Sequence, residues 1–262
     1  MLVFGSVGDR GQAVQTWFDS NRTGVSKLAI VYYGTSHDGE WVRTLRSAAD
    51  YFSFHNGGKF QNLLWWADAN VHVLNNFDYV LVADDDIVLT TEMICRMVLT
   101  AQEYSLPVSA ASHDWTEKIS WRHMGTRGAG KRMAESKGGV ELCNFVEMTC
   151  PLFTIESLWQ FIDLFRQFAD VLTGFGTDYI ISNACFSEKT PFGVLHNVII
   201  KNPRFRNGDP AAPREIDCLQ SSDVRRQAWL DVVSRSAFSI SSKRDVRSWL
   251  PSQFETNQLS QI

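Results

Sequence analysis

Cysteine is scarce in this chain of 262 residues, and no two of its five cysteines have the CxxC spacing. The spacing argues against a structural zinc site, and the odd count argues against a disulfide framework. We therefore expect reduced thiols that are buried as small apolar side chains, as in a cytoplasmic protein. The cysteines are Cys95, Cys143, Cys150, Cys185 and Cys218.

Long hydrophobic runs are also missing. No stretch approaches the ~20 apolar residues that a membrane-spanning helix needs. The first residues, MLVFGSVGDRG, have an apolar run of only three before a glycine, so we expect no signal peptide. Any membrane contact is therefore expected to be peripheral.

Strong charge of either sign is absent, because the formal net charge is -4. Nucleic-acid-binding proteins usually present a basic surface. We therefore expect no nucleic-acid partner, although phosphate groups could be bound locally through a metal ion.

The sequence instead contains short apolar runs that alternate with helical patterns. This alternation predicts βα units, and thus an α/β protein with a mostly parallel sheet. The predicted strands are 2–4, 28–33, 51–54, 79–83, 107–111, 144–153 and 194–200. The predicted helices are 11–20, 41–49, 59–75, 92–104 (capped by Thr90 or Thr91), 156–168 and 179–186.

The composition changes after Pro203, where a segment rich in Pro, Asn and Asp begins. We predict a core domain over 1–202 and a helical C-terminal appendage over 203–262. Within 221–250, arginines accompany apolar residues at helical spacing. Such helices can lie on anionic membranes, or they can pack on the core with their arginines in solvent.

Three consecutive aspartates, Asp84, Asp85 and Asp86, follow an apolar predicted strand in the segment FDYVLVADDDIVLT. Ligands of parallel α/β sheets bind beyond the carboxyl ends of the strands. Clustered carboxylates at that edge suit a hard divalent cation such as Mn²⁺ or Mg²⁺. In an extended chain Asp84 and Asp86 share a side, so we predict them as metal ligands. The alternative is a solvated acidic turn.

This D-x-D segment and three later segments, in this order, resemble the glycosyltransferases of the GT-A fold. The later segments are NFVEMTCPLFTIESL, GFGTDYIISNACF and VLHNVII. They look like the corresponding segments of an uncharacterised GT-A-like family found in plants and bacteria. The resemblance covers about 1–202, and Phe175 stands where that family usually has a tryptophan. It implies that a sugar is moved from a nucleoside-diphosphate sugar to a hydroxyl of a glycan or glycolipid acceptor.

The resemblance also implies roles for single residues. Asp178 would be the general base that activates the acceptor hydroxyl, unless Glu147 is the base. Phe175 could stack on a sugar ring, and His196 could be a third metal ligand. The alternatives are that Asp178 caps a helix beginning at Tyr179, and that His196 is a core residue.

A second set of residues is expected on the donor side. The loop after the first strand holds small residues, which allow close approach of a ligand, and an arginine that can meet phosphate. The alternative for the charged members is solvated surface. The set comprises Ser6, Gly8, Asp9, Arg10, Tyr33, Asp38, Lys59 and Asp85.

The glycine-rich and basic segment 122–139 lacks any periodic pattern. We predict a lid that excludes water from the site, because water competes with the acceptor of a transferase. Arg127, Lys131 and Arg132 could contact a diphosphate or an anionic acceptor.

The sequence is compatible with two other functions. The letters DDDIVL also resemble the motif of haloacid-dehalogenase-type phosphatases, in which Asp84 would be the nucleophile and Asp86 an acid/base. That motif normally follows the first strand of its domain. The second alternative is a non-catalytic module that holds a nucleotide-sugar or a glycan.

If the protein is a transferase, direct displacement by the acceptor hydroxyl would invert the anomeric centre.

Overall fold

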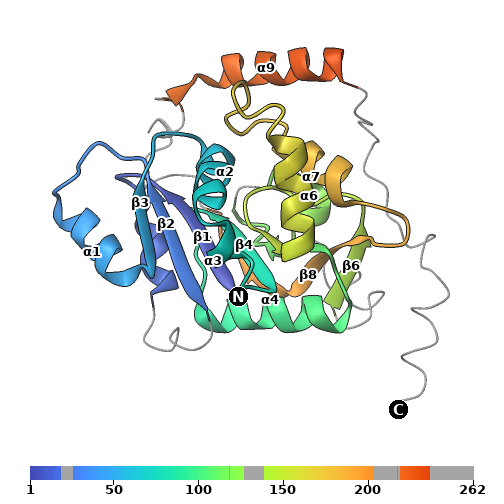
Figure 1. Ribbon diagram of the computed structural model, residues 1–262. Helices are drawn as coiled ribbons and strands as arrows, with labels where there is room; N and C mark the ends of the chain where they lie inside the picture. The colour runs from blue at the N-terminus through green and yellow to red at the C-terminus, as the bar shows by residue number, and fades with distance from the viewer. Residues whose placement is uncertain (19–25, 118, 127–138, 203–216, 218, 237–262) are drawn as a thin grey trace.

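The described part of the chain forms one mixed β-sheet with helices on both faces (Figure 1). The predicted lid residues Arg127, Lys131 and Arg132 lie outside the described part. So do residues 203–216 and 237–262 of the predicted C-terminal appendage. The computed structural model describes residues 1–18, 26–117, 119–126, 139–202, 217 and 219–236.

The described sheet has eight strands in the order β3-β2-β1-β4-β7-β5-β8-β6. All strands share one direction except β6 and β7, which run against their neighbours. This confirms the predicted α/β protein with a mostly parallel sheet. The strands are β1 Leu2–Val7, β2 Lys27–Tyr32, β3 Tyr51–Phe54, β4 Tyr79–Asp84, β5 Val108–His113, β6 Val140–Cys143, β7 Pro151–Thr154 and β8 Phe192–Ile200.

The helices follow the predicted order, with shifted ends. The predicted helix 11–20 is a 3-10 helix, and the predicted helix 59–75 is broken at Asn70, where the backbone leaves the helical region. Thr90 caps α4 by accepting a hydrogen bond from the Met93 backbone N–H at 3.3 Å. The helices are η1 Gln12–Trp17, α1 Glu40–Ala48, α2 Lys59–Ala69, α3 Val71–Leu74, α4 Thr91–Glu103, η2 Arg122–Met124, α6 Ile155–Phe165, α7 Thr177–Cys185 and α9 Ser222–Arg235.

The predicted strand 144–153 is wrong over 144–150 and correct over 151–153. Two short strands, β6 and β7, stand on either side of a loop that spans 144–150. Strand β7 inserts between β4 and β5 and is antiparallel to both. Glu147 therefore lies on the loop that leads into β7 and not within a strand.

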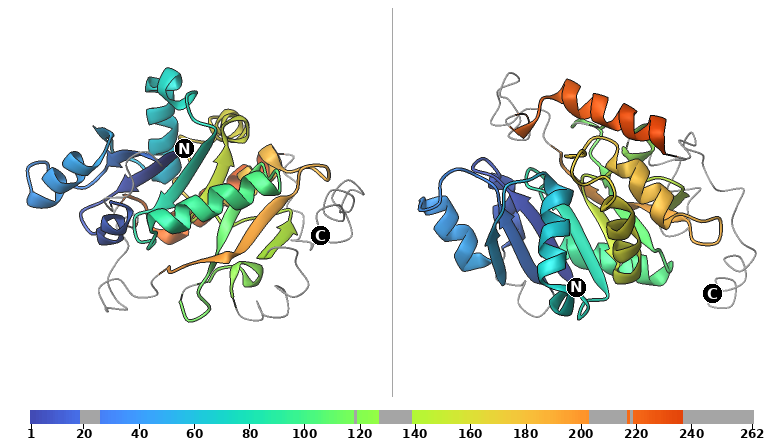
Figure 2. Two further views of the ribbon diagram at one scale, coloured as in Figure 1. Left: turned by 90° about the horizontal axis from the view of Figure 1, so that it is seen from below. Right: turned by 45° about the horizontal axis from the view of Figure 1, so that its top comes forward.

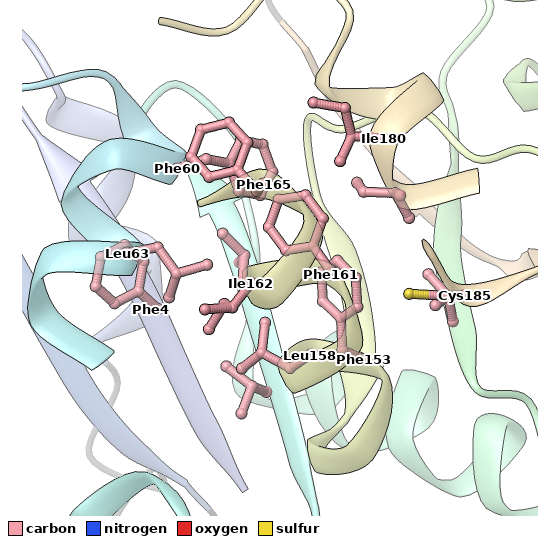
Figure 3. Close-up of a cluster of buried hydrophobic side chains, with 14 of the residues drawn as sticks. Phe4, Phe60, Leu63, Phe153, Leu158, Phe161, Ile162, Phe165, Ile180 and Cys185 are labelled. Carbon is pink, nitrogen blue, oxygen red and sulfur yellow. The ribbon is translucent and has the colours of Figure 1, made fainter. Parts of the chain in front are cut away.

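Two apolar cores cover the two faces of the sheet. One is built with η1, α1 and α4, and the other with α2, α3, α6, α7 and α9. In the second core, Phe60 of α2 meets Phe161 of α6 with ring centroids 5.1 Å apart, and Phe161 stacks on Phe165 at 5.4 Å (Figure 3). Aromatic pairs at such distances add to the free energy gained by burial. Helices α2 and α6 are thereby fixed against the middle of the sheet.

Helix α9 is the red helix near the C-terminal end of the described chain (Figure 2). It packs on this second core through Trp229 and Val232, which are buried. The indole of Trp229 stacks on the Tyr179 ring at 5.4 Å. The expectation that the arginines lie in solvent is wrong for Arg225, which is buried and pairs with Asp217 at 2.7 Å. Membrane contact through this region stays a prediction.

No described helix is long and apolar enough to cross a membrane. The four described cysteines are free thiols, and Cys143, Cys150 and Cys185 are buried, as predicted. Cys95 is only half-buried. Burial raises the pKa of the Cys150 and Cys185 thiols to about 12, so both stay protonated and unreactive at neutral pH.

The fold requires glycine at position 176, because there is no room for a side chain there. Its φ of +86° is in the left-handed region, and a Cβ atom there would lie 2.2 Å from the Trp229 ring. We predict that Gly176→Ala lowers the free energy of unfolding by about 3 kcal/mol or more, because the strained backbone and the displaced indole both contribute. Urea denaturation measures this change.

Gly139 provides the matched control for this prediction. Its φ is +78°, but a Cβ atom there would approach Asn197 only to 3.3 Å. Gly139→Ala should therefore show mainly the cost of the left-handed conformation, about 1–2 kcal/mol. Equal losses in the two variants would contradict a special role for the contact between Gly176 and Trp229.

Candidate active site

A cleft opens at the edge of the sheet where β1 and β4 end. Because parallel strands end at one edge, residues that follow β1, β4 and β5 lie near one another there. Strand β7 runs the opposite way, so the loop 144–150 reaches this edge too, and the Asp84 N–H donates to the Thr149 carbonyl at 2.8 Å. The cleft is lined by Ser6, Tyr33, Gly57, Gly58, Lys59, Phe60, Asp84, Asp85, Asp86, Met148, Thr173, Gly174 and Leu219.

Residues predicted from distant parts of the sequence thus meet in one cleft. Six predicted site residues are among those that line it: Ser6, Tyr33, Lys59, Asp84, Asp85 and Asp86. Residues next in sequence to the two predicted bases, or close to them, line it as well, namely Met148 for Glu147 and Gly174 for Asp178.

Asp84 ends β4 and forms an ion pair with Lys59, in which the Lys59 Nζ lies 2.7 Å from Asp84 Oδ1. The same ammonium donates to the Thr149 carbonyl at 3.3 Å and to the Met148 carbonyl. Lys59 begins α2, and Gly58 before it donates its N–H to Gln61 Oε1 at 2.8 Å. The start of α2 therefore fixes the lysine against the end of β4.

Asp85 points to the loop after β1. Its Oδ2 accepts from the Gly8 N–H at 2.9 Å and from the Tyr33 hydroxyl at 3.3 Å, and the residue is buried. A Cβ atom at Gly11 would lie 2.7 Å from the same oxygen, so only glycine allows this approach. Asp85 therefore ties the loops after β1 and β2 to the end of β4.

His113 is a site residue that the sequence did not indicate. It ends β5 fully buried, with its Nε2 at 3.2 Å from Thr149 Oγ1 and 3.9 Å from Glu147 Oε2. Burial lowers its pKa from 6.5 to about 4, although the negative charge of Asp86 acts in the other direction. The imidazole is therefore neutral at neutral pH. Extending the predicted strand 107–111 by one alternation would have placed His113 on it.

The two predicted bases are held by neighbouring residues of one segment. The Ser120 hydroxyl donates to Glu147 Oε1 at 2.8 Å, and the Trp121 indole N–H donates to Asp178 Oδ2 at 3.2 Å. Both acids are buried, with 5% and 8% of their surfaces exposed. The structure thus connects Glu147 and Asp178 through two consecutive residues.

The alternative that Asp178 caps a helix beginning at Tyr179 is wrong in its geometry. Helix α7 begins one residue before Asp178, and its N-cap is Gly176. Asp178 lies in the first turn, and its Oδ1 accepts from the Tyr179 N–H at 3.1 Å. A carboxylate there is favoured by the helix dipole, so the position still has a structural value.

His196 is not placed as a metal ligand. Its Nε2 lies 2.9 Å from Glu141 Oε2 and its Nδ1 lies 3.0 Å from Ser112 Oγ, in a buried network between β5, β6 and β8. With both ring nitrogens in hydrogen bonds, neither lone pair is directed at a metal ion. The core-residue alternative describes His196 better.

The remaining predicted residues do not line the cleft. Asp9 accepts from Tyr32 and Thr35; burial opposes its ionisation, but these hydrogen bonds outweigh it and lower its pKa. Asp9 thus braces the loop after β2. Arg10 and Asp38 are exposed, and Phe175 is 45% exposed beside the cleft residue Gly174.

The carboxylates at the cleft have the hard oxygen atoms that a divalent cation prefers. Their arrangement is less suited, because Asp84 is paired with Lys59 and Asp85 is turned to Gly8. Among the described residues, no group of three or more His, Cys, Asp or Glu side chains is arranged to hold a metal ion. Asp86 is the third aspartate that lines the cleft.

The pKa of His113 predicts a pH-dependent stability. Between pH 6.5 and about 4 the unfolded chain takes up a proton at this residue that the folded chain does not, so stability falls as pH falls. We predict that His113→Gln reduces the loss of unfolding free energy between pH 7 and pH 4.5 by up to roughly 3 kcal/mol. Urea denaturation across this range measures it.

The exposed His72 of α3, replaced as His72→Gln, is the matched control. If His113→Gln loses stability with falling pH as steeply as the unchanged protein, the burial argument for His113 is wrong.

Comparisons with known proteins give relatives only at the level of structure. No family model matches the chain, and no curated protein matches it. A crystal structure of GalNAc-T7 with UDP, GalNAc and Mn²⁺ is similar with a TM-score of 0.58 and 10% sequence identity, over 89% of this chain and 48% of that one. A crystal structure of S. aureus TarS 1-349 is similar with a TM-score of 0.50 and 12% identity, over 77% of this chain and 60% of that one.

Both neighbours are glycosyltransferases of the GT-A type, and this chain spans only 48% and 60% of their lengths. At such low identity the likeness concerns the fold. Together with the mostly parallel sheet and the flanking helices, it shows that the chain has the GT-A fold.

Proposed function

We propose that the chain is a glycosyltransferase that moves a sugar from a nucleoside-diphosphate sugar to a hydroxyl of a glycan or glycolipid. The observation that carries this proposal is the cleft at the strand ends, where Lys59 and three aspartates line one side. Met148 and Gly174, from the segments that carry the buried acids Glu147 and Asp178, line the same cleft. The GT-A fold supports it, as does the UDP bound by the neighbour GalNAc-T7. A phosphatase of the haloacid-dehalogenase type is not favoured. Its nucleophilic aspartate normally follows the first strand of the domain, whereas Asp84 ends β4.

The donor side of the proposed site is the wall formed by the ends of β1, β2 and β4. Ser6, Tyr33 and Lys59 line it, and Gly8 and Asp9 hold the loops that border it. Ser6 is oriented by Asn62, whose amide donates to its hydroxyl at 2.7 Å. These groups would bind the nucleoside diphosphate, with Arg10 and Asp38 at the exposed rim.

A divalent cation, Mn²⁺ or Mg²⁺, belongs to the proposal, and Asp86 would hold it with Asp84 nearby. When bound, such an ion neutralises negative charge on a leaving nucleoside diphosphate. Lys59 adds a positive charge at the same wall, fixed by its hydrogen bonds to the loop 144–150.

We place the acceptor side where Thr173, Gly174 and Leu219 line the cleft. Asp178 would take the proton from the acceptor hydroxyl, while the Trp121 indole orients its carboxylate. Glu147 is the alternative base, and Phe175 would stack on a sugar ring. One displacement by the activated hydroxyl inverts the anomeric centre.

Asp86 should carry the metal-dependent part of donor binding. We predict that Asp86→Ala removes the Mn²⁺-dependent increase in nucleoside-diphosphate affinity while the fold stays intact. A panel of nucleoside diphosphates and nucleotide-sugars, tested by thermal shift and calorimetry with and without Mn²⁺, measures it. An unchanged response to Mn²⁺ in the variant would refute the assignment.

Asp178 should affect transfer and not donor binding. Asp178→Asn keeps the side-chain size but cannot take a proton, so transfer should fall by about 10²–10⁴-fold while donor affinity changes by only a few-fold. The measurement is the transfer rate with a donor found in the panel, alongside donor affinity.

Glu147→Gln is the matched comparison for this variant. Near-normal transfer by Asp178→Asn with loss in Glu147→Gln would assign the base to Glu147. Near-normal transfer by both variants would show that neither acid is the base. Tight donor binding without transfer or hydrolysis by the unchanged protein would favour the non-catalytic module.

A further inference from the structure

The ammonium of Lys59 sits in a cage of three oxygen atoms. Asp84 Oδ1 lies 2.7 Å from Nζ and the Thr149 carbonyl 3.3 Å, and the Met148 carbonyl is the third acceptor. An ammonium group has three donors, so this cage satisfies all of them. Only 10% of the lysine side chain is exposed, compared with 57% for Lys27 in the surface pair with Asp50.

Helix α2 does not by itself explain a lysine at this position. Lys59 is its first residue, where the helix dipole favours negative charge and disfavours a cation. Burying an ammonium is also costly unless an opposite charge and hydrogen bonds compensate. The compensation comes from Asp84 and the loop 144–150, which belong to the cleft and not to the helix.

Two other side chains that were considered for cation binding already make hydrogen bonds of their own. Asp85 is engaged by the Gly8 N–H and Tyr33, and His196 is engaged by Glu141 and Ser112. Asp84 would be the natural second ligand beside Asp86, but its charge is already balanced by an ammonium 2.7 Å away. An ion that approached Asp84 would meet the repulsion of Lys59 at close range.

We infer that Lys59 is the resident counter-cation of Asp84: its ammonium takes the place of a metal ion at that carboxylate, and a divalent cation at the cleft is held without Asp84. This deepens the proposed function and rests on it for one consequence. Lys59 then forms a permanent cationic part of the diphosphate-binding wall. Part of the affinity for a nucleoside diphosphate is therefore independent of metal.

The test uses Mn²⁺ alone as the probe, with no nucleotide, and measures its affinity by electron paramagnetic resonance. Lys59→Met releases Asp84, so Mn²⁺ should bind about tenfold more tightly or better than to the unchanged protein. The double variant Lys59→Met with Asp84→Asn should lose this gain. Asp84→Asn alone should stay within about threefold of the unchanged protein.

Two outcomes overturn the inference. Weakening of Mn²⁺ binding by tenfold in Asp84→Asn alone would show that Asp84 ligates the ion while Lys59 is present. Unchanged Mn²⁺ affinity in a folded Lys59→Met protein would show that the ammonium does not compete. The Asp84→Asn arm keeps the lysine, so the inference stays testable if Lys59→Met does not fold. Lys27→Met, which breaks the surface pair with Asp50, is the control for removal of a lysine.

A nucleotide arm separates this inference from the proposed function. With a chelator present, the unchanged protein should still bind UDP, and Lys59→Met should bind it at least about tenfold more weakly. If no nucleoside diphosphate binds under any condition, the proposed function fails while the Mn²⁺ results still decide the role of Lys59. If UDP binding disappears completely with the chelator, the metal-independent contribution of Lys59 is wrong.

Discussion

The antiparallel position of β7 between β4 and β5 is the constraint on which the cleft depends. A strand that ran with its neighbours would deliver its preceding loop to the opposite edge of the sheet. Because β7 runs against them, the loop 144–150 arrives beside the aspartates, where Thr149 accepts from the Asp84 N–H and its hydroxyl meets His113. The carbonyls that hold Lys59 come from the same loop. One reversed strand thus assembles a charged wall from residues more than sixty positions apart.

Much of the fold follows from local patterns in the sequence. Apolar runs such as Leu28–Tyr32 and the run before Asp84 predicted buried strands, because both faces of a central parallel strand are covered. The region 144–153 could not be assigned in the same way. Most of its residues are apolar, yet the chain forms a loop at Phe145 and Val146 and returns to a strand only at Pro151. An apolar segment indicates that the chain is buried there, but it does not distinguish a buried loop from a buried strand.

The candidate site was predictable in its members but not in their partners. The aspartates, Lys59, Tyr33 and Ser6 do meet at one cleft, as the strand-end rule requires. Which carboxylate each cation selects depends on the tertiary packing, so the pair of Lys59 with Asp84 and the inward turn of Asp85 could not be foreseen. The network of His196 arises at a register shift, where Ala111 pairs with Leu195 but Ser112 pairs with Ile199. The periodic pattern of apolar residues in the sequence does not reveal such a shift in strand register.

The contact between Gly176 and Trp229 has a consequence for variation of the sequence. The indole lies where a side chain at position 176 would begin, and it also stacks on Tyr179 in the turn that carries Asp178. Any residue larger than glycine at 176 needs a smaller residue at 229, so the two positions are not free to change independently. Through this pair, the composition of the C-terminal helix α9 is coupled to the geometry of a segment fifty residues earlier that borders the cleft.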